Sequence, residues 1–327
     1  MRVFIKPLTN DNVTLTAYLL DASNEMVNTR VRPAILIFPG GAYRSCSDRE
    51  AEPVAMAFLA EGYHAFVLRY SVNQMDAYPK ALADAEEALE LIRYHSAEWN
   101  IDPGKIAVCG FSAGGHLASA LGTMGRVRPN ALILCYANTL FREAGISPMP
   151  IPGVTEHVDA STPPSFIFHT CADRVTPVRS ALSFASALEA ANVPFELHIF
   201  QQGEHGLSLA KPVTSGGARS MINDDAAKWF DHCIAWLKNI FGEFEARDEI
   251  MLNENIQEYG VDVQLGVLWK NPECRKLVVD FMPELGANDL LKDAMGIPLR
   301  KIFEFSGVPE PEIRSMNKRL KQIQLLK

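Results

Sequence analysis

Residues 106–115 read Ile106-Ala-Val-Cys-Gly110-Phe-Ser112-Ala-Gly-Gly115, an apolar run that ends at a serine framed by glycines. The run 106–109 is typical of a buried strand, and residues 115–124 carry apolar side chains at the three- and four-residue spacing of a helix. A serine between the two must lie in a sharp, strained turn, and only small residues at 110 and 114 let a neighbouring strand and helix approach it. The stretch therefore predicts a strand, a tight turn and a helix in direct succession.

The same alternation of strand and helix continues on both sides of this turn. An alternating run predicts a strand at 13–20, and compact apolar runs predict further strands at 34–38, 65–69, 131–135, 166–169 and 196–200. Helical spacing predicts helices at 51–60, 79–95, 178–191 and 224–239. This rhythm builds a mostly parallel, twisted sheet with helices on both faces, so the predicted fold class is α/β.

The pattern changes after residue 241, where a polar stretch leads into a segment without further strands of this kind. We therefore predict a boundary near residue 245, with an α/β unit over 1–245 and a small helical extension over 246–327. Prolines begin three segments of the extension, where a first helical turn tolerates them, and Gly286 and Gly307 are candidate stops. These segments are 272–285, 298–305 and 311–326.

Composition limits the classes of partner. The chain has 31 Lys and Arg against 39 Asp and Glu, a net charge of −8, and no long run of like charge, so we expect no nucleic-acid partner. The first residues lack the apolar core of a secretion signal, and the apolar runs are too short to cross a membrane. We expect a cytoplasmic protein with no membrane partner. The six cysteines lack C-x-x-C spacing, which favours reduced thiols over disulfides or metal ligands. The sequence leaves the oligomeric state open, a homo-oligomer included.

Ser112 has the surroundings of a nucleophile, because the strand, turn and helix around it match the G-x-S-x-G elbow. A serine hydroxyl must pass its proton to a base, and in such chains an acidic residue and then a histidine follow the serine. Asp173 follows the strand 166–169, and His205 follows the strand 196–200 in a glycine-flanked loop. We predict Ser112 as nucleophile, His205 as general base and Asp173 as the carboxylate that orients the histidine.

Other residues compete for these roles. Glu204, next to His205, is an alternative orienting carboxylate, and Asp173 is alternatively a turn residue ahead of Pro177. His116 lies on the helix after Ser112, and we expect it to be structural because it should point back along that helix.

Acyl transfer also needs N–H donors for the negative charge that develops on the carbonyl oxygen, the oxyanion. Pro39-Gly-Gly-Ala-Tyr43 follows the strand 34–38 in the position of the HGGG loop of lipases and esterases. We predict the backbone amides of Gly41, Ala42 and Ala113 as donors. Tyr43, Phe111 and the proline-rich loop 138–164 are predicted to line the pocket for the acyl group.

These motifs together resemble the α/β-hydrolase superfamily, most closely its acetyl-esterase or acetylxylan-esterase-like branch. The resemblance covers about residues 12–242 and rests on residues 39–43, 110–115, 173–177 and 203–206. It implies an α/β-hydrolase fold and hydrolysis of short acyl esters, often acetyl groups on sugars, with no cofactor and no metal. Proline replaces the histidine of the HGGG loop at position 39, which affects the choice of donors more than the activity.

The sequence thus predicts a serine esterase of the EC 3.1.1 type, acting through an acyl-enzyme on a small-molecule ester such as an acetylated sugar. One alternative is a serine peptidase of the prolyl-oligopeptidase type, which shares the motif order; no propeller or other large gating domain precedes the core in this sequence. Another is a hydrolase-like binding protein with a dead site, whose helical extension contacts a partner. The intact set of motif residues argues against this last alternative.

Overall fold

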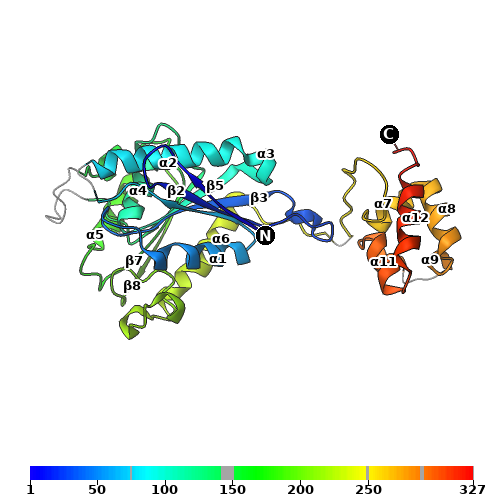
Figure 1. The fold of residues 1–327 in the computed structure, drawn as a ribbon. Helices are drawn as coiled ribbons and strands as arrows, with labels where there is room; N and C mark the ends of the chain where they lie inside the picture. The colour runs from blue at the N-terminus through cyan, green and yellow to red at the C-terminus, as the bar shows by residue number, and fades with distance from the viewer. Residues whose placement is uncertain (74–75, 141–150, 248–249, 288–290, 327) are drawn as a thin grey trace. The chain divides into compact units, whose positions relative to one another are not determined.

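The computed structural model describes residues 1–73, 76–140, 151–247, 250–287 and 291–326 (Figure 1). The chain divides into two compact units, the first comprising residues 1–21 with 31–243 and the second residues 22–30 with 244–327. The sequence analysis assigned residues 22–30 to the first unit, whereas the structure counts them with the second. The second unit is therefore built from two separate pieces of the chain.

An eight-stranded sheet forms the centre of the first unit, in the order β1-β2-β4-β3-β5-β6-β7-β8. The β1–β2 and β2–β4 pairs are antiparallel, and all later pairs are parallel. The strands are β1 Arg2–Pro7, β2 Thr14–Leu19, β3 Arg32–Phe38, β4 His64–Arg69, β5 Ile101–Phe111, β6 Ala131–Cys135, β7 Ser165–Thr170 and β8 Phe195–Phe200. The predicted α/β fold with a mostly parallel sheet is confirmed.

Helices cover both faces of the sheet (Figure 1). In the view of Figure 1, α2 lies above the sheet and α1 lies below it. The helices of this unit are α1 Glu52–Ala60, α2 Ala77–Tyr94, α3 Ser96–Trp99, α4 Ala113–Thr123, α5 Arg179–Ala190 and α6 Trp229–Phe241.

The central strands carry long apolar runs because both of their faces are buried. In β3, Leu36 and Phe38 belong to the hydrophobic cluster that includes residues of α2 and α4, while Ile35 and Ile37 belong to the cluster that includes residues of α1 and α6. Successive side chains of a strand point to opposite faces, so an uninterrupted apolar run fills both clusters at once.

The edge strand β1 was not predicted from the sequence. Its exposed face carries apolar side chains, since Val3 is 52% and Ile5 65% exposed, while Phe4 packs against the core and contacts Trp99. The hydrophobic and hydrophilic residues of β1 thus do not separate cleanly between its faces, and the period-2 signal of a half-buried strand is weak.

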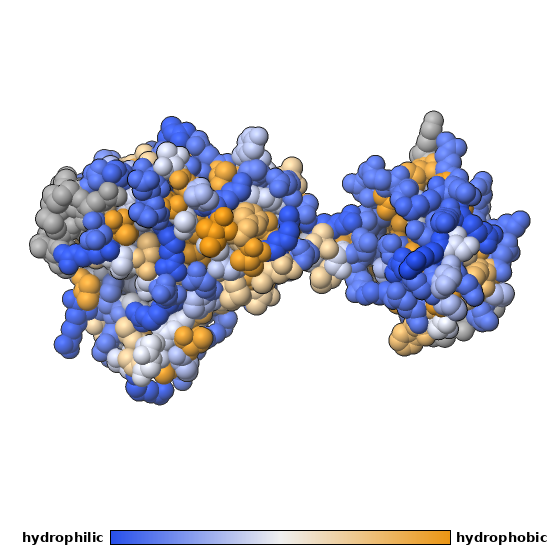
Figure 2. Space-filling view, viewed as in Figure 1, coloured by the Kyte–Doolittle hydropathy of each residue, from blue (hydrophilic) through white to orange (hydrophobic). Residues whose placement is uncertain are grey.

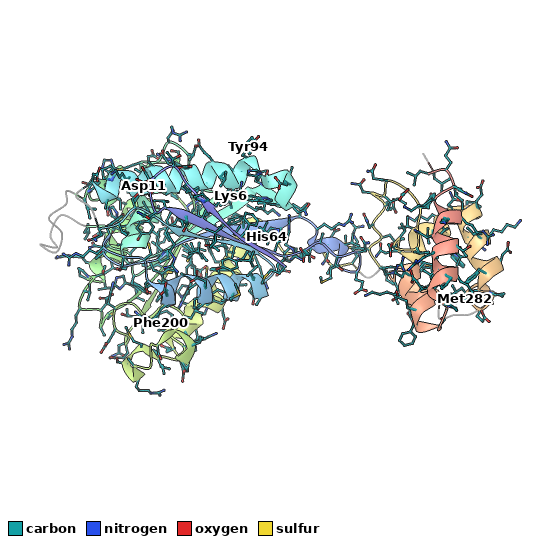
Figure 3. The ribbon with its side chains drawn as sticks, viewed as in Figure 1. Lys6, Asp11, His64, Tyr94, Phe200 and Met282 are labelled. Atoms are coloured by element: carbon teal, nitrogen blue, oxygen red, sulfur yellow. The ribbon has the colours of Figure 1, made fainter. Side chains whose placement is uncertain are left out.

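His64, at the start of β4, has a structural role (Figure 3). Its ring is fully buried and its Nδ1 accepts a hydrogen bond from the Leu20 N–H at 3.1 Å. Burial lowers the pKa of His64 to about 4. The imidazole is therefore neutral and serves as a fixed acceptor between two strands.

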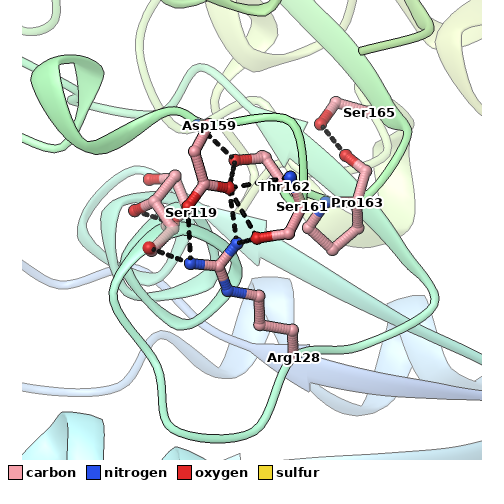
Figure 4. Close-up of polar contacts among 8 residues, drawn as sticks. Ser119, Arg128, Asp159, Ser161, Thr162, Pro163 and Ser165 are labelled. Carbon is pink, nitrogen blue, oxygen red and sulfur yellow. Dashed lines mark hydrogen bonds and ion pairs between the residues drawn. The ribbon is translucent and has the colours of Figure 1, made fainter. Parts of the chain in front are cut away.

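Arg128 fastens the segment before β7 to the end of helix α4 (Figure 4). Its guanidinium donates to the Thr123 carbonyl at 2.6 Å and to Asp159 Oδ1 at 2.7 Å. Asp159 Oδ1 also accepts from the Ser161 N–H at 2.9 Å. Hydrogen bonds from Arg128 and Ser161 hold the pKa of the Asp159 carboxyl well below its usual range. A cation at the helix C-terminus is favourable, so one side chain satisfies the helix end and anchors the loop.

The second unit consists of short helices around a core of its own. Buried side chains at its centre include Leu265, Leu268, Val278, Phe303 and Ile313. Its helices are α7 Leu265–Lys270, α8 Pro272–Phe281, α9 Glu284–Ala287, α10 Leu291–Ala294, α11 Leu299–Phe305 and α12 Glu310–Leu320. Pro272 takes the first position of α8, where its missing N–H costs nothing.

Residues 22–30 join the second unit through polar contacts. Asn24 Nδ2 donates to the Asp262 carbonyl at 3.2 Å, and Lys301 pairs with Glu25. Arg30 hydrogen-bonds Asn253. The segment therefore leaves the sheet after β2 and is held by residues that lie more than 200 positions later.

The outer surface mixes hydrophobic and hydrophilic residues on both units (Figure 2). Among the helices in the described ranges, none is both long enough and apolar enough to cross a bilayer.

We expect Asn271→Ala to loosen α8. Asn271 caps this helix, since its side chain accepts from the Glu273 N–H at 2.8 Å and the Cys274 N–H at 3.3 Å. Loss of such a cap costs about 1 kcal/mol. Hydrogen exchange followed by mass spectrometry should show faster exchange in residues 272–281 of Asn271→Ala and near-normal exchange in Asn271→Asp, which keeps the acceptor. Equal protection in Asn271→Ala and the unmodified protein would contradict the cap.

Candidate active site

The candidate site lies at the carboxyl ends of the parallel strands. The register pairs Phe38 with Gly110, Phe111 with Cys135, and Thr170 with Phe200, so the strands from β3 to β8 end near one another. Loops that follow these strands therefore begin side by side, which is where open α/β sheets place their sites. The donor loop (residues 39–43), Ser112, Asp173 and the histidine loop (residues 201–210) all start at this edge.

Ser112 occupies a strained turn between β5 and α4. Its backbone has φ 52° and ψ −116°, a conformation that L-residues rarely adopt. The Ser112 N–H donates to the Cys135 carbonyl at 3.0 Å, which fixes the turn against β6. The contact with β6 thus stabilises the strained backbone, and the Ser112 side chain points away from the sheet.

The glycines around Ser112 are required by close approach. A Cβ at Gly110 would lie 2.2 Å from the Gly114 carbonyl oxygen, and one at Gly114 would lie 2.0 Å from the Phe38 carbonyl oxygen. A Cβ at Gly115 would lie 2.6 Å from the Ala137 Cβ. No side chain fits at these positions, so the motif is a steric consequence of packing α4 onto β3 and β6.

The structure brings Ser112, His205 and Asp173 into one hydrogen-bonded chain. Ser112 Oγ lies 2.8 Å from His205 Nε2, and His205 Nδ1 lies 2.7 Å from Asp173 Oδ2. Because a carboxylate only accepts, Nδ1 carries the proton and Nε2 is free to accept from the serine hydroxyl. His205 is thus oriented as a base toward Ser112. Glu204, the alternative orienting residue, is exposed, and it is Asp173 that contacts His205.

The Asp173 carboxylate is buried but well satisfied. Its other oxygen, Oδ1, accepts from the Val175 N–H at 2.8 Å and the Thr176 N–H at 2.9 Å. Burial alone would raise the pKa of the Asp173 carboxyl, but the hydrogen bonds from His205 and these amides outweigh it and hold the pKa below its ordinary value. The group is therefore a carboxylate at neutral pH, as the orienting role requires.

The donor loop is held by its carbonyl groups. The Tyr70 O–H donates to the Pro39 carbonyl at 2.6 Å, the Ser47 N–H to the Gly40 carbonyl at 2.9 Å, and the Asn73 N–H to the Tyr43 carbonyl at 2.7 Å. The Gly41 carbonyl accepts from two further amides of the same turn. The loop backbone is therefore fixed over most of its length.

The amides that sequence analysis proposed as donors are left without a partner. Among the described residues, none accepts a hydrogen bond from the N–H of Gly41, Ala42 or Ala113. Positive φ angles at Gly41 (139°) and Ala42 (53°) turn the loop sharply at this point. Ala113 is the first residue of α4, where the helix dipole adds positive potential to the free N–H. These three amides are available to an anionic oxygen.

Tyr43 and Phe111 lie in the core rather than at a surface that a substrate can reach. Both are fully buried. The Tyr43 O–H donates to His116 Nδ1 at 2.7 Å, and His116 Nε2 donates to the Pro152 carbonyl at 2.9 Å, so Tyr43 anchors the donor loop. Burial lowers the pKa of His116 to about 4, which keeps its ring neutral in this structural role. Phe111, the last residue of β5, packs against Trp229 in the hydrophobic cluster that also includes residues of α1 and α6. Residues 141–150 of the predicted pocket loop lie outside the described residues.

A network of buried polar residues that contacts the donor loop was not predicted from the sequence. The Gly40 N–H donates to Glu50 Oε2 at 2.8 Å, and the Tyr136 O–H donates to Glu50 Oε1 at 2.6 Å. The Ser208 N–H in turn donates to the Tyr136 oxygen at 2.9 Å. Tyr136 directly follows β6, at the edge where Ser112 lies, and this position was the one available sequence signal.

A surface depression of about 610 Å³ adjoins His205. Polar side chains of Arg174, Gln202, Ser220 and Asn223 contribute to its lining. It opens between the loops that carry Asp173 and His205 and offers hydrogen-bond donors and acceptors beside His205. In the described part of the chain, no three His, Cys, Asp or Glu side chains are grouped as a metal site would need.

Parts of the chain match two families of known proteins. Residues 20–133 match the BD-FAE family, and residues 153–243 match the prolyl oligopeptidase family. The first range contains the donor loop and Ser112, and the second contains Asp173 and His205.

A solved structure matches a larger share of the chain than either family does. MGS-M1, an α/β-hydrolase enzyme from a Medee basin deep-sea metagenome library, is 46% identical with a TM-score of 0.69, and the match covers 73% of this chain and 98% of that one. The chain belongs to the α/β-hydrolase superfamily. The chain is also 37% identical to the acetyl ester-xyloside bifunctional hydrolase from Caldicellulosiruptor lactoaceticus, with a TM-score of 0.61 over 71% of this chain and 89% of that one.

A curated relative refines the placement of the chain within the superfamily. The acetylxylan esterase of Xylanibacter ruminicola is 31% identical over 201 residues, which are 54% of this chain and 41% of that enzyme. The chain spans less than half the length of the first two curated relatives that it matches. These similarities place it in the acetylxylan-esterase-like branch of the superfamily.

We expect Gly114→Ala to destabilise the first unit by about 3 kcal/mol, because overpacking against a backbone carbonyl forces β3 and α4 apart. A lowered midpoint in urea unfolding would measure this loss. Gly104→Ala is the matched control, since Gly104 is exposed and its added Cβ would come no closer than 3.2 Å to Asp102 Oδ1. Similar unfolding midpoints for both variants would show that the close approach at Gly114 is not a constraint.

Proposed function

We propose that this α/β-hydrolase cleaves carboxylic esters of short acyl groups, acetyl esters above all, with Ser112 as the nucleophile. The observation that carries the proposal is the chain from Ser112 Oγ through His205 to Asp173, with separations of 2.8 and 2.7 Å. The amides of Gly41 and Ala113, which have no acceptor among the described residues, support it, because an ester carbonyl needs such donors as it becomes tetrahedral.

The mechanism follows from the hydrogen-bond directions. Ser112 Oγ attacks the ester carbonyl carbon while His205 Nε2 takes the hydroxyl proton, and the oxyanion is held by backbone N–H groups. The C–O bond to the alcohol then breaks, and His205 returns the proton to the leaving oxygen. Water repeats the attack on the acyl-enzyme and releases the acid. Asp173 keeps Nδ1 protonated and stabilises the imidazolium throughout.

Acetylated sugars are the substrate class that we propose for this site. Two similar proteins are named as an acetylxylan esterase and an acetyl ester-xyloside bifunctional hydrolase. The polar lining of the depression beside His205 supports an alcohol rich in hydroxyl groups, since the leaving alcohol departs next to the base.

A serine peptidase is the second candidate, because residues 153–243 match the prolyl oligopeptidase family. That range contains Asp173 and His205, which both kinds of enzyme use, so it does not by itself favour a peptide substrate. The substrates tested first should therefore include a peptide.

We expect hydrolysis of p-nitrophenyl acetate to exceed that of the butyrate and octanoate esters, and Ser112→Ala to lower kcat at least about a thousandfold. Release of p-nitrophenol gives the rates, acetate release from acetylated xylan tests the sugar class, and a prolyl p-nitroanilide tests the peptidase alternative. A protein that hydrolyses none of the esters is not a general esterase.

Asp173→Asn should lower kcat by about 10⁴-fold, because an amide cannot hold His205 in the tautomer with a proton on Nδ1. Glu204→Gln is the matched control beside the histidine, and we expect its kcat on p-nitrophenyl acetate to stay within about twofold. The reverse ranking of the two variants would make Glu204 the orienting carboxylate.

A further inference from the structure

Glu50 is a buried carboxylate that none of the proposed catalytic steps uses. Its side chain is 3% exposed, although it belongs to the charged triplet Asp48-Arg-Glu50 ahead of α1. Its two oxygens accept from different parts of the site: Oε2 from the Gly40 N–H at 2.8 Å and Oε1 from the Tyr136 O–H at 2.6 Å.

Gly40 brings this carboxylate close to the nucleophile. A Cβ built on Gly40 would lie 2.7 Å from Glu50 Oε2, 2.8 Å from the Phe111 carbonyl oxygen and 3.0 Å from the Ser112 Cβ. Gly40 is thus enclosed by Glu50 and the serine turn. The hydrogen bond from its N–H sets the orientation of the Pro39–Gly40 peptide plane, which lies one peptide before the Gly41 N–H that is a proposed oxyanion donor.

The other end of the network reaches the histidine loop. Tyr136 accepts from the Ser208 N–H at 2.9 Å, and its ring packs edge-on against the His205 ring with centroids 5.2 Å apart. The Ser208 hydroxyl donates to the Arg49 carbonyl at 2.5 Å. Residues 49 and 50 therefore fasten the histidine loop with one set of contacts and the donor loop with another.

Burying a carboxylate costs desolvation free energy, because the charged group loses its hydration. In the described part of the chain, no Lys, Arg or His side chain forms an ion pair with Glu50, and burial raises the pKa of its carboxyl. Hydrogen bonds from the Tyr136 O–H and the Gly40 N–H favour the ionised form and oppose this rise, and both donors belong to loops of the site. The desolvation is therefore offset by contacts that hold those loops.

We propose that Glu50 is a positioning residue, which, with Tyr136, fixes the donor loop relative to the Ser112–His205 pair. The inference rests on the proposed esterase function and deepens it. Glu50 touches no reacting atom; it acts through the Gly40 peptide and through the Tyr136 hydroxyl. Its loss frees the donor loop and mainly weakens stabilisation of the tetrahedral species rather than binding of the ester.

The test compares Glu50→Ala, Glu50→Gln and Tyr136→Phe with a matched control, Glu52→Gln. Glu52 lies two residues further on, half-exposed and paired with Arg69, outside the site. Three quantities are measured for each folded variant: kcat and KM for p-nitrophenyl acetate, the inhibition constant of an aryl trifluoromethyl ketone, and the thermal unfolding midpoint. The ketone forms a tetrahedral adduct with a serine and so reports on the donors directly.

We expect Glu50→Ala to lower kcat by about 100-fold, close to the loss of one oxyanion donor, with KM changed less than about threefold. The inhibition constant of the ketone should rise by a similar factor. Glu50→Gln keeps an acceptor for Gly40 and a partner for Tyr136, and should retain kcat within about tenfold. Tyr136→Phe should lie between the two, and Glu52→Gln should match the unmodified protein.

Retention of kcat and of ketone affinity within about twofold in Glu50→Ala would overturn the proposal. So would a folded Glu50→Gln as impaired as Glu50→Ala, because the charge rather than the geometry would then matter. If Glu50→Ala does not fold, Tyr136→Phe decides, and its unchanged kcat would count against the network. An unmodified protein that neither hydrolyses the ester nor binds the ketone contradicts the esterase function itself, which separates that failure from one of Glu50 alone.

Discussion

The close approach of the Ser112 turn to its neighbouring strands is the constraint on which the site depends. The turn holds Ser112 at φ 52°, a conformation that costs on the order of 1–3 kcal/mol. Gly114 lies so near the Phe38 carbonyl that a methyl group would come within 2.0 Å of it, and the Cys135 carbonyl holds the serine N–H from the other side. Because the serine is fixed at the end of β5, the loops after β3, β7 and β8, which begin at the same edge of the sheet, can place their residues around it.

Sequence periodicity predicts the centre of this fold better than its margins. The runs predicted at 34–38, 131–135 and 166–169, which lie in β3, β6 and β7, are almost entirely apolar because both faces of each strand are buried. β1 was missed because Val3 and Ile5 stay exposed on an edge strand. The assignment of residues 22–30 to the second unit depends on contacts with residues such as Asp262 and Lys301, which local sequence cannot reveal.

In the candidate site, the positions of residues along the backbone could be predicted from the sequence, whereas the directions of several side chains could not. Ser112, Asp173 and His205 could be found because each follows a recognisable strand, and strand ends meet at one edge of the sheet. Side-chain direction in an irregular loop depends on individual φ angles and on neighbours. Tyr43, with φ 56°, turns inward to His116 instead of facing a substrate, and Glu50 has the sequence context of a solvated helix start although it is buried.

A donor loop that works through backbone amides has no functional side chains of its own to hold it in place. Its rigidity must come from neighbouring groups, and here these bind the carbonyl groups of Pro39, Gly40, Gly41 and Tyr43 and the single amide of Gly40. Within the described part of the chain, the amides of Gly41 and Ala42 have no acceptor, while the rest of the loop is hydrogen-bonded. Stabilisation of an oxyanion depends on donors that need not reorganise during the reaction. In the proposed function, the buried tyrosines and the buried carboxylate around this loop keep its amides in the one arrangement that the oxyanion requires.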